Sequence, residues 1–181
     1  MIRLAFFVLF SIPIICISWR SILSFKNHGL YRLISWECIL WLIISNIIYW
    51  FTDPFSINQV ISWILLFLSL FYIISGAIIM KKANNTDNKR DQSLYNFEKT
   101  SEIIETGLFK YIRHPLYSSL LFLTWGIFLK HPDYLLLIIS VLSTATLIFT
   151  AKVEEQENIR YFGDQYRAYM KKTRMFIPFV L

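Results

Sequence analysis

The sequence is poor in the residue types that break, cross-link or solvate a chain. Its 181 residues include only five Gly, five Pro and two Cys, and charged residues make up 17%. So little Gly, Pro and charge excludes a collagen-like repeat, a Gly-rich linker protein and a disordered chain. Cys16 and Cys38 lie inside apolar runs without CxxC spacing, which favours small buried side chains over a disulfide or a metal pair.

Several motifs of nucleotide, metal and hydrolase sites are also missing. The chain has no GxGxxG, GxxxxGK[ST], HExxH or GxSxG, which excludes the sites that these motifs build. His28, His114 and His131 are spread along the chain without metal-ligand spacing, so no metal is expected. The apolar runs have no charge at their middle, and Glu37 comes nearest to one, so an ion pathway is not predicted.

Apolar residues are abundant, and they come in long runs. Hydrophobic residues make up 56% of the chain and aromatic residues 18%. A helix that crosses a membrane needs about 20 apolar residues. The sequence therefore predicts an all-α, polytopic membrane protein with about five transmembrane helices. The five runs cover residues 2–19, 33–51, 57–80, 116–129 and 134–151.

The last two runs are joined by a short polar turn and are predicted to form a helical hairpin. The fourth run corresponds to roughly 21 Å of helix at 1.5 Å per residue. That length is too short to cross alone unless the polar residues before it lie in a protein-lined cavity. The chain thus divides into a three-span region, residues 1–80, and a region with the hairpin and most polar residues, 81–181.

The cations predict the orientation in the membrane. If five spans alternate, 16 of the 18 Lys and Arg fall on one side, and only Arg3 and Lys130 on the other. The positive-inside rule then places the N-terminus outside and the C-terminus in the cytoplasm. This topology accounts for the net charge of +6 without a nucleic-acid partner. The first run lacks the basic start and small-residue site of a cleavable signal peptide, and the missing endoplasmic-reticulum retention signal favours a bacterial inner membrane.

Two polar segments on the cytoplasmic side, residues 99–117 and 152–178, hold the candidate site. Pro115 suits the first position of a helix, with His114 near the cap. The free N–H groups there favour a carboxylate or a phosphate, or else the segment is a plain interfacial cap with Arg113 reaching the headgroups. Glu154 and Glu155 follow the fifth run, where carboxylates need a partner or water, although a solvated helix face is the alternative.

The end of the chain alternates aromatic and basic residues. Tyr and Phe side chains between 161 and 179 are interspersed with Arg and Lys. This pattern predicts a cytoplasmic C-terminal amphipathic helix on the membrane surface, with its basic face toward anionic lipid.

The order of these motifs resembles a known superfamily. TGLFKYIRHPLY at 106–117, a short hydrophobic hairpin, two Glu, FGDQYRAY at 162–169 and a closing R-x-x-IP follow one another. This order is similar to that of the integral-membrane methyltransferases, which include isoprenylcysteine carboxyl methyltransferases and phospholipid N-methyltransferases. The resemblance covers residues 99–178. It implies methyl transfer from S-adenosyl-L-methionine to a lipophilic, membrane-borne acceptor, either the carboxylate of a prenylated cysteine or a phospholipid amine.

The resemblance also implies site residues. The helix start would hold the methionine carboxylate, Glu154 its ammonium or a ribose hydroxyl, and Phe109 and Tyr117 the sulfonium by cation–π contact. Glu155 and Arg174 are candidates for a catalytic role that is otherwise unassigned. The residues implied to bind the cofactor are Ser101, Glu102, Ile103, Ile104, Phe109, His114, Pro115, Leu116, Tyr117 and Glu154.

Two positions depart from the family pattern. Phe109 stands where the family usually has Tyr, and Thr150 stands where isoprenylcysteine enzymes usually have an Arg that contacts the acceptor carboxylate. Both departures favour one alternative, a non-catalytic membrane scaffold that keeps the fold. A second alternative is an NADPH-dependent membrane reductase of related architecture.

Overall fold

The computed structural model describes residues 1–23, 28–82 and 100–178, and in these ranges the chain is helical. The only β-type pairing among them is an isolated parallel bridge between Ile112 and Arg174. The all-α prediction is therefore confirmed. The described elements are α1 (Ile2–Leu23), α2 (Gly29–Asn46), η1 (Ile47–Tyr49), α3 (Ile57–Lys82), η3 (Gly107–Lys110), α4 (Pro115–Phe128), α5 (Tyr134–Phe162) and α6 (Asp164–Lys172).

Each predicted apolar run is mostly helical, although residues 50–51 of the second run and residue 129 of the fourth lie beyond η1 and α4. Four helical stretches in the described part of the chain are long and apolar enough to cross a membrane, namely α1, α2 with η1, α3 and α5. These four helical stretches support the prediction of an integral membrane protein. α4 is a shorter apolar helix of 14 residues, so the fifth crossing stays a prediction. α5 continues to Phe162 beyond the predicted end of its run at residue 151.

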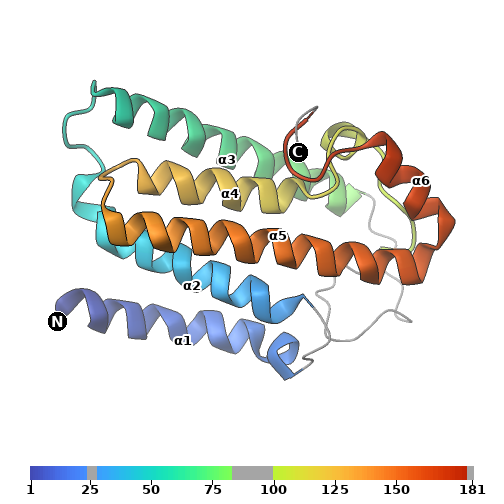
Figure 1. The fold of residues 1–181 in the computed structure, drawn as a ribbon, viewed down its shortest axis with the longest axis horizontal. Helices are drawn as coiled ribbons and strands as arrows, with labels where there is room; N and C mark the ends of the chain where they lie inside the picture. The colour runs from blue at the N-terminus through green and yellow to red at the C-terminus, as the bar shows by residue number, and fades with distance from the viewer. Residues whose placement is uncertain (24–27, 83–99, 179–181) are drawn as a thin grey trace.

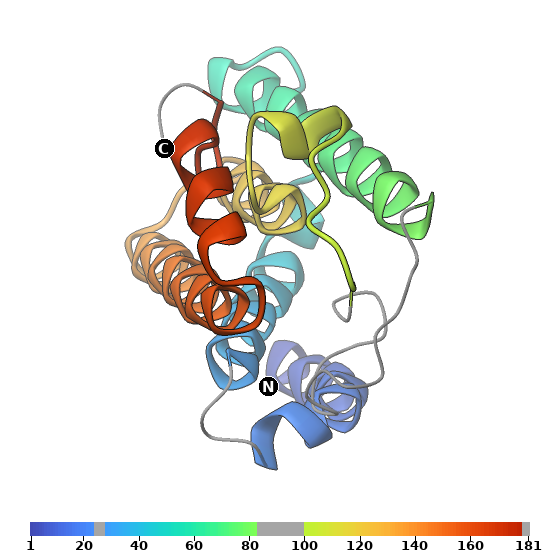
Figure 2. The same cartoon turned by 90° about the vertical axis from the view of Figure 1, so that its right-hand side faces the viewer.

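The short helix α4 lies at the centre of the bundle. It packs against α3, α5 and α2, while α1 lies along the outer side of α2 (Figures 1 and 2). Its buried face includes small or hydroxylated residues such as Ser118, Ser119, Thr124 and Gly126. Small residues let helices approach closely where lipid supplies no hydrophobic driving force between them.

Short polar side chains join the helices across the bundle interior. The Oγ of Ser35 on α2 lies 2.7 Å from Oγ1 of Thr146 on α5. The Oγ of Ser62 on α3 donates to the carbonyl of Gly126 on α4 at 2.6 Å. A Cβ at Gly126 would lie 3.0 Å from the Leu66 side chain, so glycine allows this close contact between α3 and α4.

A cluster of aromatic and polar side chains closes the end of the bundle at the α2–α3 and α4–α5 turns. Lys130 is 5% exposed, and its ammonium lies 3.7 Å from the centre of the Trp63 ring. The same ammonium donates to Oε1 of Gln59 at 3.0 Å. Tyr49, just after α2, stacks on His131 with 3.9 Å between ring centres. The cluster thus ties the end of α2, the start of α3 and the α4–α5 turn together.

At the other end, the chain after α5 folds back over the start of α4. α5 ends at Phe162, and its C-cap Gly163 has a φ of +62°, a conformation that favours glycine. α6 follows directly. The residues after α6 pair with the segment before α4, because His114 N–H donates to the Met175 carbonyl at 3.1 Å. Ser118 Oγ also donates to the Phe176 carbonyl at 2.7 Å. α6 buries Tyr166 and Tyr169, and its place at a membrane surface stays a prediction.

Candidate functional site

The site is built at the start of α4. Pro115 is the first residue of this helix and His114 is its N-cap, as the sequence predicts. The N–H groups of a first helical turn have no acceptor inside the helix, and the positive end of the helix dipole points the same way. His114 itself is buried, with 5% of its surface exposed. The helix start therefore presents donors next to a desolvated imidazole.

Arg113 points into the protein, which contradicts the alternative in which it reaches lipid headgroups. Its Nε donates to Oε1 of Glu155 at 2.6 Å, and its side chain is 9% exposed. Its Nη1 donates to the carbonyls of Thr173 at 2.5 Å and Met170 at 3.3 Å. Arg113 thus connects the segment before α4 with α5 and with the end of α6.

The two neighbouring carboxylates have different surroundings. Glu155 is 6% exposed, bound by Arg113, and 3.4 Å from Nε2 of His114. It is therefore no part of a solvated helix face. Glu154 is 23% exposed, accepts a hydrogen bond from the Tyr117 hydroxyl at 2.6 Å, and lies 3.8 Å from Nδ1 of His114. Glu154 is the carboxylate that remains accessible to a ligand.

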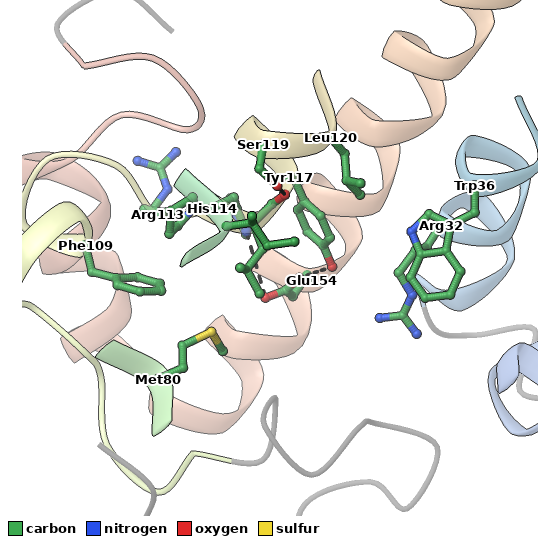
Figure 3. A pocket seen from close by; sticks show the side chains of 13 residues that line it. Arg32, Trp36, Met80, Phe109, Arg113, His114, Tyr117, Ser119, Leu120 and Glu154 are labelled. Atoms are coloured by element: carbon green, nitrogen blue, oxygen red, sulfur yellow. Dashed lines mark hydrogen bonds and ion pairs between the residues drawn. The ribbon is translucent and has the colours of Figure 1, made fainter. Parts of the chain in front are cut away.

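A largely apolar cavity of about 280 Å³ opens in front of Glu154, close to the lower limit of about 300 Å³ for small-molecule sites. It lies between α2 and α3, and α4 forms its floor. Figure 3 shows Arg32 and Trp36 on one side and Phe109 and Met80 on the other. The lining residues are Arg32, Trp36, Ile73, Met80, Phe109, Arg113, His114, Pro115, Leu116, Tyr117, Ser119, Leu120 and Glu154.

A smaller and more polar cavity of about 80 Å³ adjoins the first. Met80, Phe109, Arg113 and Glu154 line both cavities. The wall between them is therefore narrow, and Glu154 stands at their junction. The smaller cavity is otherwise lined by Thr100, Glu102, Ile103, Ile104, Asn158, Phe162, Tyr166 and Tyr169.

Two phenols in the smaller cavity stay protonated at all ordinary pH values. Burial, with a further contribution from the charge of Glu154, raises the pKa of Tyr166 well above its usual range. Burial also raises the pKa of Tyr169, whose hydroxyl donates to the Phe109 carbonyl at 2.6 Å. Tyr169 thereby fixes the 3₁₀ turn that positions the Phe109 ring.

The structure brings together most of the residues that the sequence predicts for the cofactor. Phe109, His114, Pro115, Leu116, Tyr117 and Glu154 line the larger cavity, and Glu102, Ile103 and Ile104 line the smaller one. Ser101 lines neither. Among the candidates for catalysis, Glu155 lines neither cavity either, and Arg174 is exposed and lines a separate basic hollow with Lys171 and Lys172. These assignments stay predictions.

Other cavity residues escape sequence reasoning. Arg32 and Trp36 come from α2, and Ile73 and Met80 from α3, and only long-range packing brings them to α4. Two other pairs of cavity residues could have been predicted from their spacing in the sequence. Asn158 follows Glu154 by one helical turn, and Tyr166 and Tyr169 are three residues apart, so each pair shares a helix face.

The described residues contain no group of three or more His, Cys, Asp or Glu that could hold a metal ion. The ionisable groups of the site are instead paired or placed singly along the cavities, as Arg113 with Glu155 and Tyr117 with Glu154. The arrangement suits an organic ligand with both charged and apolar parts.

Comparison with known proteins identifies the family to which this chain is similar. The family model for phospholipid methyltransferases matches residues 59–165. Methanethiol S-methyltransferase 1 of Bradyrhizobium diazoefficiens is 29% identical over 117 residues, which cover 64% of this chain and 38% of the relative. Methanethiol S-methyltransferase of Pseudomonas deceptionensis is 30% identical over 73 residues, 39% of this chain and 26% of the relative.

A eukaryotic relative matches as well. Protein-S-isoprenylcysteine O-methyltransferase of Xenopus laevis is 25% identical over 126 residues, which cover 66% of this chain and 42% of the relative. The chain thus spans well under half the length of these relatives. No solved structure matches it.

Proposed function

Because the chain belongs to the phospholipid methyltransferase family, we propose that it transfers a methyl group from S-adenosyl-L-methionine to a lipophilic acceptor in the membrane. The observation that supports this proposal most is the position of Glu154. This carboxylate stands where a small polar cavity meets a larger apolar one. The methyl donor would extend from the smaller cavity past Glu154 to the start of α4, and the apolar remainder of the larger cavity would suit the methyl acceptor.

The residues present fit the methyl donor. The donor N–H groups at the start of α4 suit a carboxylate, and the partly exposed Glu154 suits an ammonium or a ribose hydroxyl. The rings of Phe109 and Tyr117 line the same space and suit a cation by its attraction to their faces. The ten residues that the resemblance implies for the cofactor keep this role as a proposal.

When bound, the cofactor would supply a methyl group on a positively charged sulfur. The protein then has to align two reactants and exclude water, which are the main sources of rate acceleration for such a transfer. The apolar walls at Ile73 and Leu120 would exclude water from the acceptor. The gap between α2 and α3 would admit an acceptor sideways from the bilayer.

We further propose five membrane crossings, with the N-terminus outside and the C-terminus in the cytoplasm of a bacterial inner membrane. Lys81 and Lys82 at the end of α3, and Lys171 and Lys172 in α6, lie at the cavity end of the bundle, which supports a cytoplasmic position for that end. α4 begins at the cavity, so its polar start at His114 is sheltered from lipid.

Cysteine labelling tests this orientation. In a chain whose two native cysteines are replaced by serine, Thr52→Cys is expected to react with a membrane-impermeant maleimide on intact cells. Arg160→Cys is expected to react only after the membrane is opened. Both positions are exposed, so the reverse pattern would contradict the proposed topology.

Ligand binding to the purified full chain tests the function. In lipid nanodiscs, S-adenosylmethionine and S-adenosylhomocysteine are expected to bind with micromolar affinity in calorimetry, and NADPH is not. Methyl transfer from the labelled cofactor to membrane-soluble acceptors would follow. A folded chain that binds neither at millimolar concentration would contradict the proposal and favour the scaffold, whereas selective binding of NADPH would favour the reductase.

A further inference from the structure

We propose that the basic hollow beside the segment before α4 binds the phosphate of an anionic phospholipid, and that this lipid strengthens binding of the cofactor. The hollow has a volume of about 250 Å³ and is lined by Tyr111, Lys171, Lys172, Thr173 and Arg174. It shares no lining residue with the two cavities, so the lipid bound there is not the methyl acceptor. The effect on the cofactor rests on the proposed methyl transfer, whereas the lipid site itself does not.

The hollow gathers positive charge without a compensating acid. Lys171, Lys172 and Arg174 are exposed cations within four consecutive residues, and no carboxylate is among the lining residues. Among the described residues, none of these three cations has an ion-pair partner. Lys110 adds a fourth cation, because its ammonium lies 5.9 Å from the centre of the Tyr111 ring. Like charges this close repel one another, and a bound phosphate would relieve that repulsion.

The hollow lies at the height of the lipid headgroups. α3 has 26 residues, which is about 39 Å of helix at 1.5 Å per residue and more than the hydrocarbon thickness of about 30 Å. Its last turn carries Lys81 and Lys82, which places that end among the headgroups. Figure 1 shows η3 and the end of α6 at the height of these last turns, and Figure 2 shows α6 at the edge of the bundle. Headgroups can therefore reach the hollow.

The lining favours a lipid phosphate over a soluble one. The guanidinium of Arg174 matches two phosphate oxygens, and the lysine ammoniums add point charges. The Tyr111 side chain is 47% exposed, and tyrosine rings are enriched where hydrocarbon meets water. Anionic lipids attract basic residues at this depth. Cations beside an interfacial ring thus suit a phosphate that carries acyl chains.

The backbone of the hollow also holds the start of α4. The segments before α4 and after α6 form a parallel bridge. In it the Arg174 N–H donates to the Tyr111 carbonyl at 2.9 Å, and the Arg113 N–H donates to the Arg174 carbonyl at 2.8 Å. The next hydrogen bond, from the His114 N–H to the Met175 carbonyl, reaches the N-cap of α4. Arg174 therefore lines the hollow and is bound through its backbone to the cavity residues.

A side-chain contact makes the same connection. Nη1 of Arg113 donates to the Thr173 carbonyl at 2.5 Å, and Arg113 lines both cavities. A lipid that fixes residues 171–174 therefore also fixes Arg113 and the start of α4. Because two ligands that favour the same arrangement strengthen each other's binding by the same factor, the cofactor should in turn strengthen binding of the lipid.

Competition between two lipids tests the site without the cofactor. The full chain in a neutral detergent receives equal amounts of phosphatidylglycerol and phosphatidylcholine with the same acyl chains, and native mass spectrometry identifies the lipid that stays bound. Phosphatidylglycerol is expected to be retained about 10- to 100-fold more strongly, as for a few cations at an anionic surface. The double variant Lys171→Gln with Lys172→Gln should lose most of this preference. Arg160→Gln with Arg167→Gln removes the same charge at exposed positions outside the hollow and should keep it.

Calorimetry tests the effect on the cofactor site. S-adenosylhomocysteine has no net charge, so the surface potential of the membrane does not concentrate it. It is expected to bind at least about 5-fold more tightly in nanodiscs with equal parts of phosphatidylglycerol and phosphatidylcholine than in pure phosphatidylcholine, the lower end of typical coupling between two sites. The Lys171 and Lys172 double variant should bind it equally in both lipids, and the Arg160 and Arg167 double variant should keep the difference.

Three results would overturn the inference. They are equal retention of the two lipids, an equal loss of preference in both double variants, and displacement of phosphatidylglycerol by inorganic phosphate at the same concentration, which would indicate a site for soluble phosphate. Lipid retention without any change in S-adenosylhomocysteine affinity would overturn the proposed effect on the cofactor. Failure of the proposed function is distinct from these results, because the chain would then bind no S-adenosylhomocysteine in either lipid while its lipid preference could still be measured.

Discussion

Replacement of Arg113 by methionine is expected to lower the free energy of unfolding by about 3–5 kcal/mol, the cost of breaking a buried ion pair from one side. Arg113 binds the buried carboxylate of Glu155 and the carbonyls of Thr173 and Met170. Without it, Glu155 keeps a buried charge, and the carbonyls of Met170 in the last turn of α6 and of Thr173 directly after it lose a donor. Chemical unfolding of the detergent-purified chain, followed by tryptophan fluorescence, measures the loss.

A double variant separates the ion pair from the packing. Arg113→Met combined with Glu155→Met removes both charges and keeps similar volumes, so it is expected to recover the part of the lost stability that comes from the unpaired charge. The carbonyls of Met170 and Thr173 still lack their donor. Arg167→Met is the control, because its side chain is 62% exposed and its contact with Asp164 is a surface pair, worth at most about 1 kcal/mol. If Arg113→Met were as stable as Arg167→Met, Arg113 would not be the residue that connects the segment before α4 with α5 and α6.

Replacement of Glu154 by glutamine is expected to weaken binding of S-adenosylmethionine by about 10- to 100-fold, the range for a hydrogen bond to a charged group. Glutamine has the same shape and still accepts the hydrogen bond that the Tyr117 hydroxyl gives at 2.6 Å. Only the charge at the junction of the two cavities is removed. S-adenosylhomocysteine should be affected equally, since it has the same ammonium.

Calorimetry with both ligands measures this effect, and Glu105→Gln is the matched control. Glu105 is exposed and lines neither cavity, so its variant should bind like the parent chain. If Glu154→Gln and Glu105→Gln gave the same affinity, Glu154 would have no part in holding the cofactor, and the assignment of the junction would be wrong.

The sequence predicts those parts of the fold that depend on local patterns. The apolar runs give the helices, because length and composition decide whether a segment is stable in lipid. The start of α4 is also local, since Pro115 fits the first turn and places His114 at the cap. The end of α5 is harder to predict from local sequence. Residues 152–162 are mostly polar and form no apolar run, yet the helix continues to Phe162, with Gly163 as its C-cap.

The inner face of the site is less predictable, because it depends on pairs far apart in the chain. Local sequence leaves Arg113 two options. Glu155 and the carbonyls of Met170 and Thr173, all more than 40 residues later, determine that it turns inward. Arg32 resembles a loop cation beside an apolar run until α2 is extended to Gly29 and packed on α5. Residues from both sides of the predicted boundary at residue 80 therefore line the larger cavity.

The cluster around Lys130 has a mechanical consequence. It fastens α2, α3 and the α4–α5 turn at one end of the bundle, whereas the cavity separates α2 from α3 at the other end. The cluster therefore holds α2 and α3 together at the end of the bundle that is remote from the cavity. By geometry, a small change in the angle between α2 and α3 changes the separation of Arg32 and Met80, on opposite sides of the cavity, by more than it changes the contacts of Lys130.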